Sequence, residues 1–466
     1  TGGLADVVGA LPAALAPFGW QMRVMLPGYR ALRHRVGHWA EVWYEGNLWG
    51  GEGRVLSGNL DGIDLMVLDA PHLFDREGSP YGAHSGPGGD WWDNPQRFAA
   101  LSWVAAKIAR HGAGDGWKPD VLHGHDWHAG FAPAYLAYGG KGDVGSVMTI
   151  HNIAFHGLTV YNRMKDLELP ATGFTMDGFE YYGHISALKA GLTLSSALTT
   201  VSPTYAHELS TPEFGMGLEG LILSRGERVS GIVNGIDTDV WDPAADALIS
   251  ENYGAKTLKK RIANKRTLEA RFKLEAGDGL LHGVVSRLTW QKGMDIFAAG
   301  LDALVATGAR LALLGTGETA IENAIFEAAM RHPGRIGVII GYDETLSHLV
   351  QAGADTILVP SRFEPCGLTQ LYGLRYGCVP VVARTGGLND TVIDANDAAL
   401  QAGVGTGFQF APVDEATLDH TLARTAECFA DQKLWRGLQK RGMEQDVSWG
   451  RSAAAYAQLY RNLVKA

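Results

Sequence analysis

The sequence is poor in cysteine and has no long apolar run, and each shortage excludes a class of protein. Its 3 cysteines, Cys366, Cys378 and Cys428, cannot all pair with one another and do not have the spacing of a metal site. We therefore expect a reducing compartment and a cytoplasmic location. No stretch is long and apolar enough to cross a membrane.

Positive charge is also scarce. The 40 lysines and arginines are outnumbered by 50 acidic residues, which gives a formal net charge of −10. This balance argues against non-specific binding to nucleic acid or to an anionic membrane surface. It is compatible with a neutral sugar polymer, whereas an anionic nucleotide would need a local basic site. The sequence leaves the oligomeric state open.

Apolar residues and glycines are abundant. The apolar fraction of 46% allows large buried cores, and 466 residues are enough for two or three domains. The 61 glycines are spread along the chain and suit many tight turns between strands and helices.

Short apolar runs alternate with helical stretches along the whole chain, a rhythm that is typical of an α/β protein with parallel sheets. The predicted strands are 21–27, 63–68, 120–123, 146–150, 281–286, 310–314, 336–340, 356–359 and 379–383. They fall into two blocks, each long enough for a doubly wound sheet, with a boundary near 231–237. Ligands of such sheets bind at the carboxyl ends of the strands. We expect one deep cleft where two such edges face each other.

Two loops that follow predicted strands carry charged residues. In 286–293, Arg287 and Lys292 are five positions apart, where they could stabilise the charge of a departing pyrophosphate. In 360–370, Glu364 lies between prolines and a glycine, and its carboxylate could accept sugar hydroxyls. The alternatives are an ordinary pair of surface cations and a structural capping carboxylate.

Two glycine-rich turns are candidates for phosphate binding. The opening Gly2 and Gly3 precede a helical pattern, and glycine amides at a helix N-terminus favour negative charge; an ordinary turn is the alternative. Residues 315–320 formally match the dinucleotide fingerprint. However, the next predicted strand ends in Gly341-Tyr342 rather than in an acid for a ribose. A tight turn that approaches a phosphate is therefore the better interpretation.

Histidines and aromatic residues form two further clusters. The segment 123–128 holds three histidines, but no fourth ligand has standard zinc spacing. One imidazole near a reacting sugar is the alternative, with Asp126 orienting a neighbouring ring; the pattern does not rank His125 above the other two. The stretch 91–98 combines aromatic faces with amide and acid groups, which suits sugar recognition, although tryptophans are more often core.

Taken together, these segments resemble the bacterial glycogen synthases and the plant starch synthases, and the resemblance covers essentially the whole chain. The residues that carry it are 1–7, 123–130 (HGHDWHAG), 151–154, 189–192, 201–205, 233–237, 286–293, 359–373 (VPSRFEPCGLTQLYG) and 384–388. Each is weak alone, but as an ordered set they are highly specific.

The resemblance implies a GT-B architecture, in which two Rossmann-like doubly wound domains face each other across a cleft. The N-terminal, acceptor-side domain would comprise 1–230 and would be completed by 449–466, a helix that crosses back. The C-terminal domain, 231–448, would bind the nucleotide sugar. The implied reaction is a retaining transfer of glucose from ADP-glucose to the non-reducing end of an α-1,4-glucan such as glycogen, without metal or cofactor.

The resemblance also implies roles for individual residues. Arg287 and Lys292 would hold the distal phosphates of ADP, Glu364 would accept hydroxyls of the transferred glucose, and Tyr342 would stack on the base. Contacts to sugar or phosphate are implied for Gly2, Gly3, Cys366, Gly367, Leu368 and Thr369. The sugar and acceptor side would be lined by Asp6, Asp93, Asn94, Arg97, His125 and Asn234, of which Asp93 and His125 are counted as catalytic.

The chain departs from the family pattern at two places. Related sugar transferases often have a second Glu eight residues after the first, and here Tyr372 holds that position, which fits the glucan synthases. Family members also carry a short strand and a Lys directly before Thr-Gly-Gly. That strand would be central in the first sheet, and we expect an N-terminus that continues before Thr1. The alternative is a chain that starts at Thr1, for which we expect a damaged first domain and no activity.

Retention of configuration is compatible with two mechanisms. A covalent intermediate needs a carboxylate under the anomeric carbon, and the resemblance assigns Asp93 and Glu364 to hydroxyl recognition instead. We therefore favour same-face attack, in which the departing phosphate takes the proton of the acceptor. The alternatives to a glucosyltransferase are three other functions: a phosphorylase with pyridoxal phosphate, an NAD-dependent dehydrogenase and a non-catalytic glucan-binding module.

Overall fold

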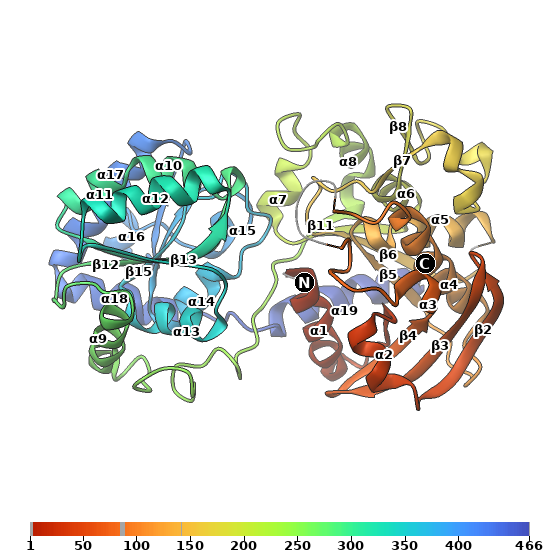
Figure 1. The fold of residues 1–466 in the computed structure, drawn as a ribbon, viewed down its shortest axis with the longest axis horizontal. Helices are drawn as coiled ribbons and strands as arrows, with labels where there is room; N and C mark the ends of the chain where they lie inside the picture. Colours follow the sequence, from red (N-terminus) through yellow and green to blue (C-terminus); the bar gives the residue numbers. More distant parts are fainter. Residues whose placement is uncertain (1–2, 84–88, 141, 466) are drawn as a thin grey trace. The chain divides into compact units, whose positions relative to one another are not determined.

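The computed structural model describes residues 3–83, 89–140 and 142–465. The chain forms two compact units (Figure 1). The N-terminal unit comprises Thr1–Val201, Ala206–Ile232 and Gly450–Ala466, and the C-terminal unit comprises Ser202–Tyr205 and Val233–Trp449. No helix in the described ranges has the length and apolar character that crossing a bilayer requires.

The first sheet of the N-terminal unit has the strand order β1-β4-β3-β2. Strands β1 (Val24–Pro27) and β4 (Ile63–Asp69) are parallel, whereas β2 (Ala40–Leu48) and β3 (Gly51–Leu60) add antiparallel pairs. The turn between β2 and β3 places Trp49 and Gly50 at positive φ, 51° and 89°, as two-residue hairpin turns require. The sequence pattern predicts β1 and β4 but not this hairpin.

The second sheet of this unit is parallel throughout, in the order β11-β10-β6-β5. Its strands are β5 (Val121–His125), β6 (Gly145–Ile150), β10 (Ala197–Thr200) and β11 (Val229–Gly231). The helices packed with it include α4 (Asn94–His111), α5 (Phe131–Tyr138), α6 (Ala187–Leu194) and α19 (Gly450–Lys465). Helix α19 contacts β5, β6 and α1 (Gly3–Leu15), so the C-terminal end of the chain completes the unit that contains its N-terminal half.

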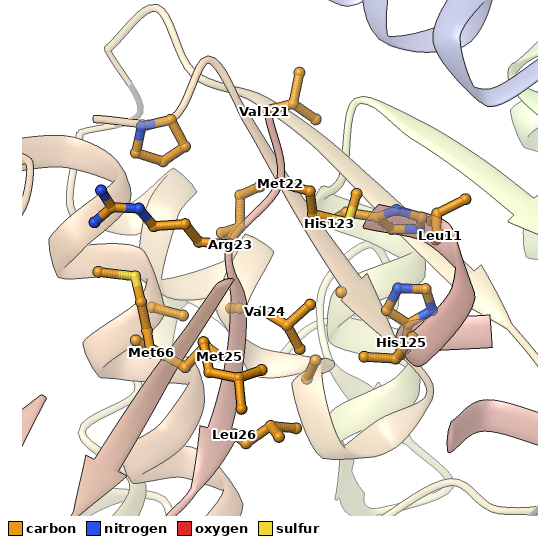
Figure 2. A pocket seen from close by; sticks show the side chains of 18 of the residues that line it. Leu11, Met22, Arg23, Val24, Met25, Leu26, Met66, Val121, His123 and His125 are labelled. Carbon is orange, nitrogen blue, oxygen red and sulfur yellow. The ribbon is translucent and has the colours of Figure 1, made fainter. Parts of the chain in front are cut away.

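A cavity of about 920 Å³ lies between the edges of these two sheets (Figure 2). Residues 21–27, which include β1, and 119–125, which include β5, line it without interruption. In the described part of the chain, each of these strands ends its sheet, with a neighbouring strand on one side only. Apolar side chains such as Leu11, Val24 and Leu26 point into the space together with His123 and His125. The cavity is therefore a gap flanked by two unpaired strand edges.

The C-terminal unit contains a parallel sheet in the order β14-β13-β12-β15-β16-β17. Its strands are β12 (Leu281–Leu288), β13 (Arg310–Gly317), β14 (Ile336–Ile340), β15 (Thr356–Val359), β16 (Val379–Ala383) and β17 (Phe408–Phe410). Helices α10 (Met294–Ala299), α11 (Leu301–Ala306), α12 (Thr319–Arg331) and α17 (Glu415–Ala430) cover one face (Figure 1). Helices α9 (Arg261–Arg271) and α13 (Glu344–Gly353) cover the other.

Alternate residues of one strand supply the two cores of this unit. Leu311 and Leu313 pack under α10–α12, while Ala312 and Leu314 pack under α9 and α13. A strand that is buried on both faces is apolar at every position, which is the pattern that predicted this sheet. The predicted strands 336–340, 356–359 and 379–383 are confirmed at those bounds.

Candidate functional site

The loop that follows β12 carries the two predicted phosphate-binding cations. Arg287 is exposed near the end of the strand, and its side chain makes no hydrogen bond or ion pair with the described residues. The chain then forms the short helix η8 (Trp290–Lys292) and turns at Gly293, where φ is +66°. A Cβ at Gly293 would lie 2.0 Å from the carbonyl oxygen of Pro360, so glycine lets this loop pack against the loop after β15.

Lys292 and Glu364, predicted from separate motifs, lie in contact. Lys292 Nζ donates to Glu364 Oε2 at 2.5 Å, and the hydroxyl of Ser361 donates to the same oxygen at 2.8 Å. Glu364 is 8% exposed, and Ser361 is fully buried. Since both loops follow the carboxyl ends of neighbouring parallel strands, the pair occupies the edge where ligands of such sheets bind.

Arg362 joins the same two loops by a second route. Its guanidinium donates two hydrogen bonds to the carboxylate of Asp295, at 2.5 and 2.8 Å, and one to the carbonyl oxygen of Trp290 at 2.7 Å. It also stacks over the Trp290 ring. The hydrogen bonds from Arg362 lower the pKa of Asp295, which keeps this carboxylate charged. The sequence predicts no role for Arg362, because its partners are distant in sequence.

The loop after β16 supports the backbone of Glu364. The amide of Gly387 donates to the carbonyl oxygens of Glu364 and Pro365, both at 3.1 Å. At Gly386 φ is +42°, and a Cβ there would meet the Glu364 carbonyl oxygen at 2.0 Å. The loops after β12 and β15 therefore hold the carboxylate of Glu364, and the loop after β16 holds its backbone. The Gly386-Gly387 pair lies in the segment 384–388 that carries the resemblance, but it is not among the predicted site residues.

Helix α14 (Thr369–Tyr376) begins directly after this carboxylate. Gly367 has φ +73°, which turns the chain into the helix, and Leu368 and Thr369 lie at its N-terminus, as anion binding would require. Burial raises the pKa of the Cys366 thiol to about 12, so it is neutral and is no nucleophile.

Asn234, from the segment 233–237, also reaches this region. Its backbone amide contacts the Cys366 thiol, and the side chain is 5% exposed. Among the described residues no donor reaches its Oδ1 atom. The C-terminal unit thus brings together Lys292, Glu364, Cys366 and Asn234.

The outer edge of this sheet carries two further predicted features. Tyr342 follows β14 and is 80% exposed, and its stacking on a base stays a prediction. At the end of β13, Glu322 accepts from the amide of Gly317 and the hydroxyl of Thr316, both at 2.8 Å. A carboxylate therefore occupies the position at which the dinucleotide fingerprint would place a phosphate. This geometry speaks against the dehydrogenase alternative.

In the N-terminal unit, Asp93, Asn94 and Arg97 each bond partners of the same unit. The carboxylate of Asp93 accepts two hydrogen bonds from the guanidinium of Arg76, at 2.7 and 2.5 Å. Asn94 donates to the carbonyl oxygen of Tyr81 at 2.8 Å and accepts from Arg97 at 2.6 Å. Arg97 is 1% exposed, and its other donors bond the carbonyl oxygens of Leu73 and Pro80. These contacts hold the start of α4, and an acceptor-binding role for the three residues stays a prediction.

The histidine cluster lies around the end of β5. His123 bonds Tyr460 and Thr149, each at 2.6 Å, while His125 Nδ1 lies 3.0 Å from His151 Nε2. Burial lowers the pKa of His125 to about 4, so its imidazole is neutral at physiological pH. Within the described ranges, no three His, Cys, Asp or Glu side chains are grouped so that they could hold a metal ion.

Asp126 links the histidine loop to the next strand. It has φ +52°, and its carboxylate accepts from the amides of His151 and Asn152 at 2.7 and 3.3 Å. Burial raises its pKa to about 7, although the two amides oppose the shift. Asp126 thus orients the backbone of His151 rather than an imidazole ring, which differs from the role predicted for it.

The remaining predicted residues lie at the N-terminus. Gly3 begins α1, and Asp6 is exposed in its first turn. Gly2 lies outside the described residues, so its predicted phosphate contact stays a prediction.

Comparisons with known proteins agree with this geometry. The family model described as the starch synthase catalytic domain matches residues 1–224, and the model for group 1 glycosyl transferases matches residues 280–425. A glycogen synthase of Cereibacter sphaeroides is 56% identical over 464 residues, covering 100% of this chain and 96% of that protein. One of Novosphingobium aromaticivorans is 55% identical over 468 residues, with the same coverage.

A solved structure extends the comparison to three dimensions. The catalytic domain of starch synthase IV from Arabidopsis thaliana, bound to ADP and acarbose, matches with a TM-score of 0.87 and 29% identity. The match covers 100% of this chain and 97% of that one. The fold, with two Rossmann-like units, and the matched families define a glycosyltransferase of the GT-B class. Identity above one half over its whole length shows that the chain belongs to the glycogen synthases.

Proposed function

We propose that this chain transfers glucose from ADP-glucose to the non-reducing end of an α-1,4-glucan, with retention of configuration and release of ADP. The observation that carries the proposal is the contact between Lys292 and Glu364 at the carboxyl edge of the parallel sheet. A cation for a leaving diphosphate and a carboxylate for sugar hydroxyls are the two groups that such a donor requires. The choice of ADP-glucose rests on the family and on the starch synthase structure, which is bound to ADP.

The proposed reaction proceeds by attack on the same face of the sugar. The bond from the anomeric carbon to the phosphate oxygen breaks, and the acceptor hydroxyl oxygen bonds to that carbon. The hydroxyl proton passes to the departing phosphate. Arg287 and Lys292 stabilise the charge that develops on the diphosphate, at roughly 2–4 kcal/mol each, while Glu364 orients the sugar. The exposed Arg287 is available for this task because no described residue competes for its guanidinium.

Elongation of glycogen with ADP-glucose, beside UDP-glucose, tests the proposal. We expect release of ADP and growth of α-linked chains, read by NMR, with ADP-glucose as the better donor. Lys292→Ala and Glu364→Ala should each lower kcat/KM by about 10²–10³-fold, the range found for removal of a single transition-state donor. Lys256→Ala, which changes an exposed lysine of the same unit, is the matched control and should retain activity.

Two results would contradict the proposal. Protein that binds glycogen but releases no ADP would be a glucan-binding module. Variants at Lys292 and Glu364 that keep the activity of the control would remove both residues from the mechanism.

A further inference from the structure

We propose that Ser361 is a positioning residue that fixes Glu364 for recognition of the donor sugar. Its hydroxyl donates to Glu364 Oε2 at 2.8 Å from a fully buried position three residues earlier in the same loop. This inference rests on the proposed role of Glu364 in binding sugar hydroxyls and identifies the group that sets the direction of its carboxylate.

The two oxygens of Glu364 have different surroundings. Oε2 receives the hydroxyl of Ser361 and the ammonium of Lys292. Oε1 receives no donor from the described residues, so it is the oxygen available to a sugar hydroxyl. A carboxylate that is anchored through one oxygen presents the other in a single direction, whereas an unanchored carboxylate rotates about its terminal bond.

Ser361 and Lys292 differ in how firmly they can hold that oxygen. Lys292 is a point charge on a flexible stem with three donors, and in the proposed reaction it also serves the diphosphate. Ser361 is part of a rigid segment, since Arg362 beside it donates from its amide to the carbonyl oxygen of Gln291 at 3.0 Å, and Pro360 packs on Gly293. Ser361 is therefore the donor that keeps Glu364 oriented when Lys292 turns to phosphate.

Sugar discrimination separates this role from a structural one. Ser361→Ala should lower kcat/KM for ADP-glucose roughly tenfold, since hydrogen bonds to charged groups have at least this effect. Donor analogues that each lack one ring hydroxyl identify the hydroxyl that Glu364 accepts. For the analogue without that hydroxyl, the loss of kcat/KM relative to ADP-glucose should be smaller in Ser361→Ala than in the unmodified chain. Affinity for ADP alone should stay within about twofold of the unmodified chain.

Three further variants complete the test. Ser361→Thr keeps the hydroxyl and should restore the discrimination ratio, and Ser361→Cys keeps the volume if alanine impairs folding. In the Glu364→Ala background, Ser361→Ala should cause no additional loss, because the residue acts only through that carboxylate. Thr425→Val removes another fully buried hydroxyl of the same unit, one that bonds a helix carbonyl, and should leave the ratio unchanged.

The outcomes distinguish this inference from the proposed function. An unmodified chain that transfers no glucose overturns both. The role of Ser361 alone is overturned if the unmodified chain is active and Glu364→Ala is impaired, but Ser361→Ala leaves the kcat/KM ratio unchanged. It is also overturned if the loss from Ser361→Ala adds to the loss from Glu364→Ala. The role is supported if Ser361→Ala decreases the ratio of kcat/KM between ADP-glucose and the analogue, and Ser361→Thr restores it.

Discussion

Two buried groups in the C-terminal unit show how burial acts on single residues. Glu364 is held beside a cation and a hydroxyl, so its environment supplies partners for the charged form. His282, in the middle of the sheet, bonds only the hydroxyl of Thr356 through Nδ1, at 2.6 Å, and its Nε2 has no partner among the described residues. The Glu364 carboxylate thus has two polar partners, whereas burial holds the imidazole of His282 neutral.

The pH dependence of stability follows from His282. Burial lowers its pKa to about 3 in the folded chain, against about 6.5 in an unfolded one. Below pH 6.5 the unfolded chain binds a proton that the folded chain refuses, so stability is lost as the pH falls from 6.5 toward 3. By pH 5 this one group should cost about 2 kcal/mol, at 1.36 kcal/mol per pH unit.

Urea unfolding of the C-terminal unit at pH 7 and pH 5 checks this prediction. His282→Asn keeps a polar group beside Thr356 but does not titrate, so it should lose less stability between the two pH values. An equal loss in both proteins would assign the acid sensitivity to other groups.

At the scale of elements, the sequence predicted the strands that are buried on both faces. Continuous apolar runs such as 336–340 and 379–383 have one interpretation when glycine turns flank them, and the structure confirms them. The hairpin β2–β3 was missed because three glycines interrupt the alternation of β3, and its pairing depends on a turn with positive φ. Local patterns identify strands but do not report such pairing.

The candidate site, like the fold, was predicted only in part. The motifs around Lys292 and Glu364 were recognised because charged residues follow strands. The contacts of Arg362 with Asp295 and of Gly387 with Glu364 were not, since they join loops that are 67 and 23 residues apart in the sequence. Which oxygen a donor meets depends on tertiary packing, and one sequence does not contain it.

The gap between β1 and β5 leads to a prediction about a whole strand. In the described part of the chain each of these two strands has a neighbour on one side only, so a separate strand can pair with both across the cavity. We expect a short separate peptide rich in valine and isoleucine, added to the protein, to pair with both open edges. Hydrogen exchange at the amides of β1 and β5 should then slow.

A peptide of the same length made of lysine and proline is the control, because proline cannot donate to a strand ladder. If neither peptide changes the exchange of β1 and β5, the gap does not accept a strand.

At the scale of the whole molecule, the chain builds its N-terminal unit from both of its ends. Helix α19 inserts Ala453, Tyr456, Ala457 and Tyr460 into that unit, each at most 2% exposed. The Tyr460 hydroxyl also lies 2.6 Å from His123 on β5. No residue of α19 belongs to the C-terminal unit, although the helix follows that unit directly in sequence. The stabilities of the two units should therefore respond differently to loss of the helix.

Truncation after Trp449 tests this division. Removal of α19 exposes the apolar surface of β5, β6 and α1, and burial of a single large side chain stabilises by about 1.5–3 kcal/mol. Because two-unit proteins do not unfold in one step, hydrogen exchange of each sheet is the appropriate measurement rather than one melting temperature. We expect faster exchange in β5 and β6 and unchanged exchange in β12 and β13. Tyr460→Phe keeps the ring and removes only the hydroxyl, so it should reproduce about 1 kcal/mol of the loss. Equal acceleration in both sheets would show instead that α19 stabilises the two units together.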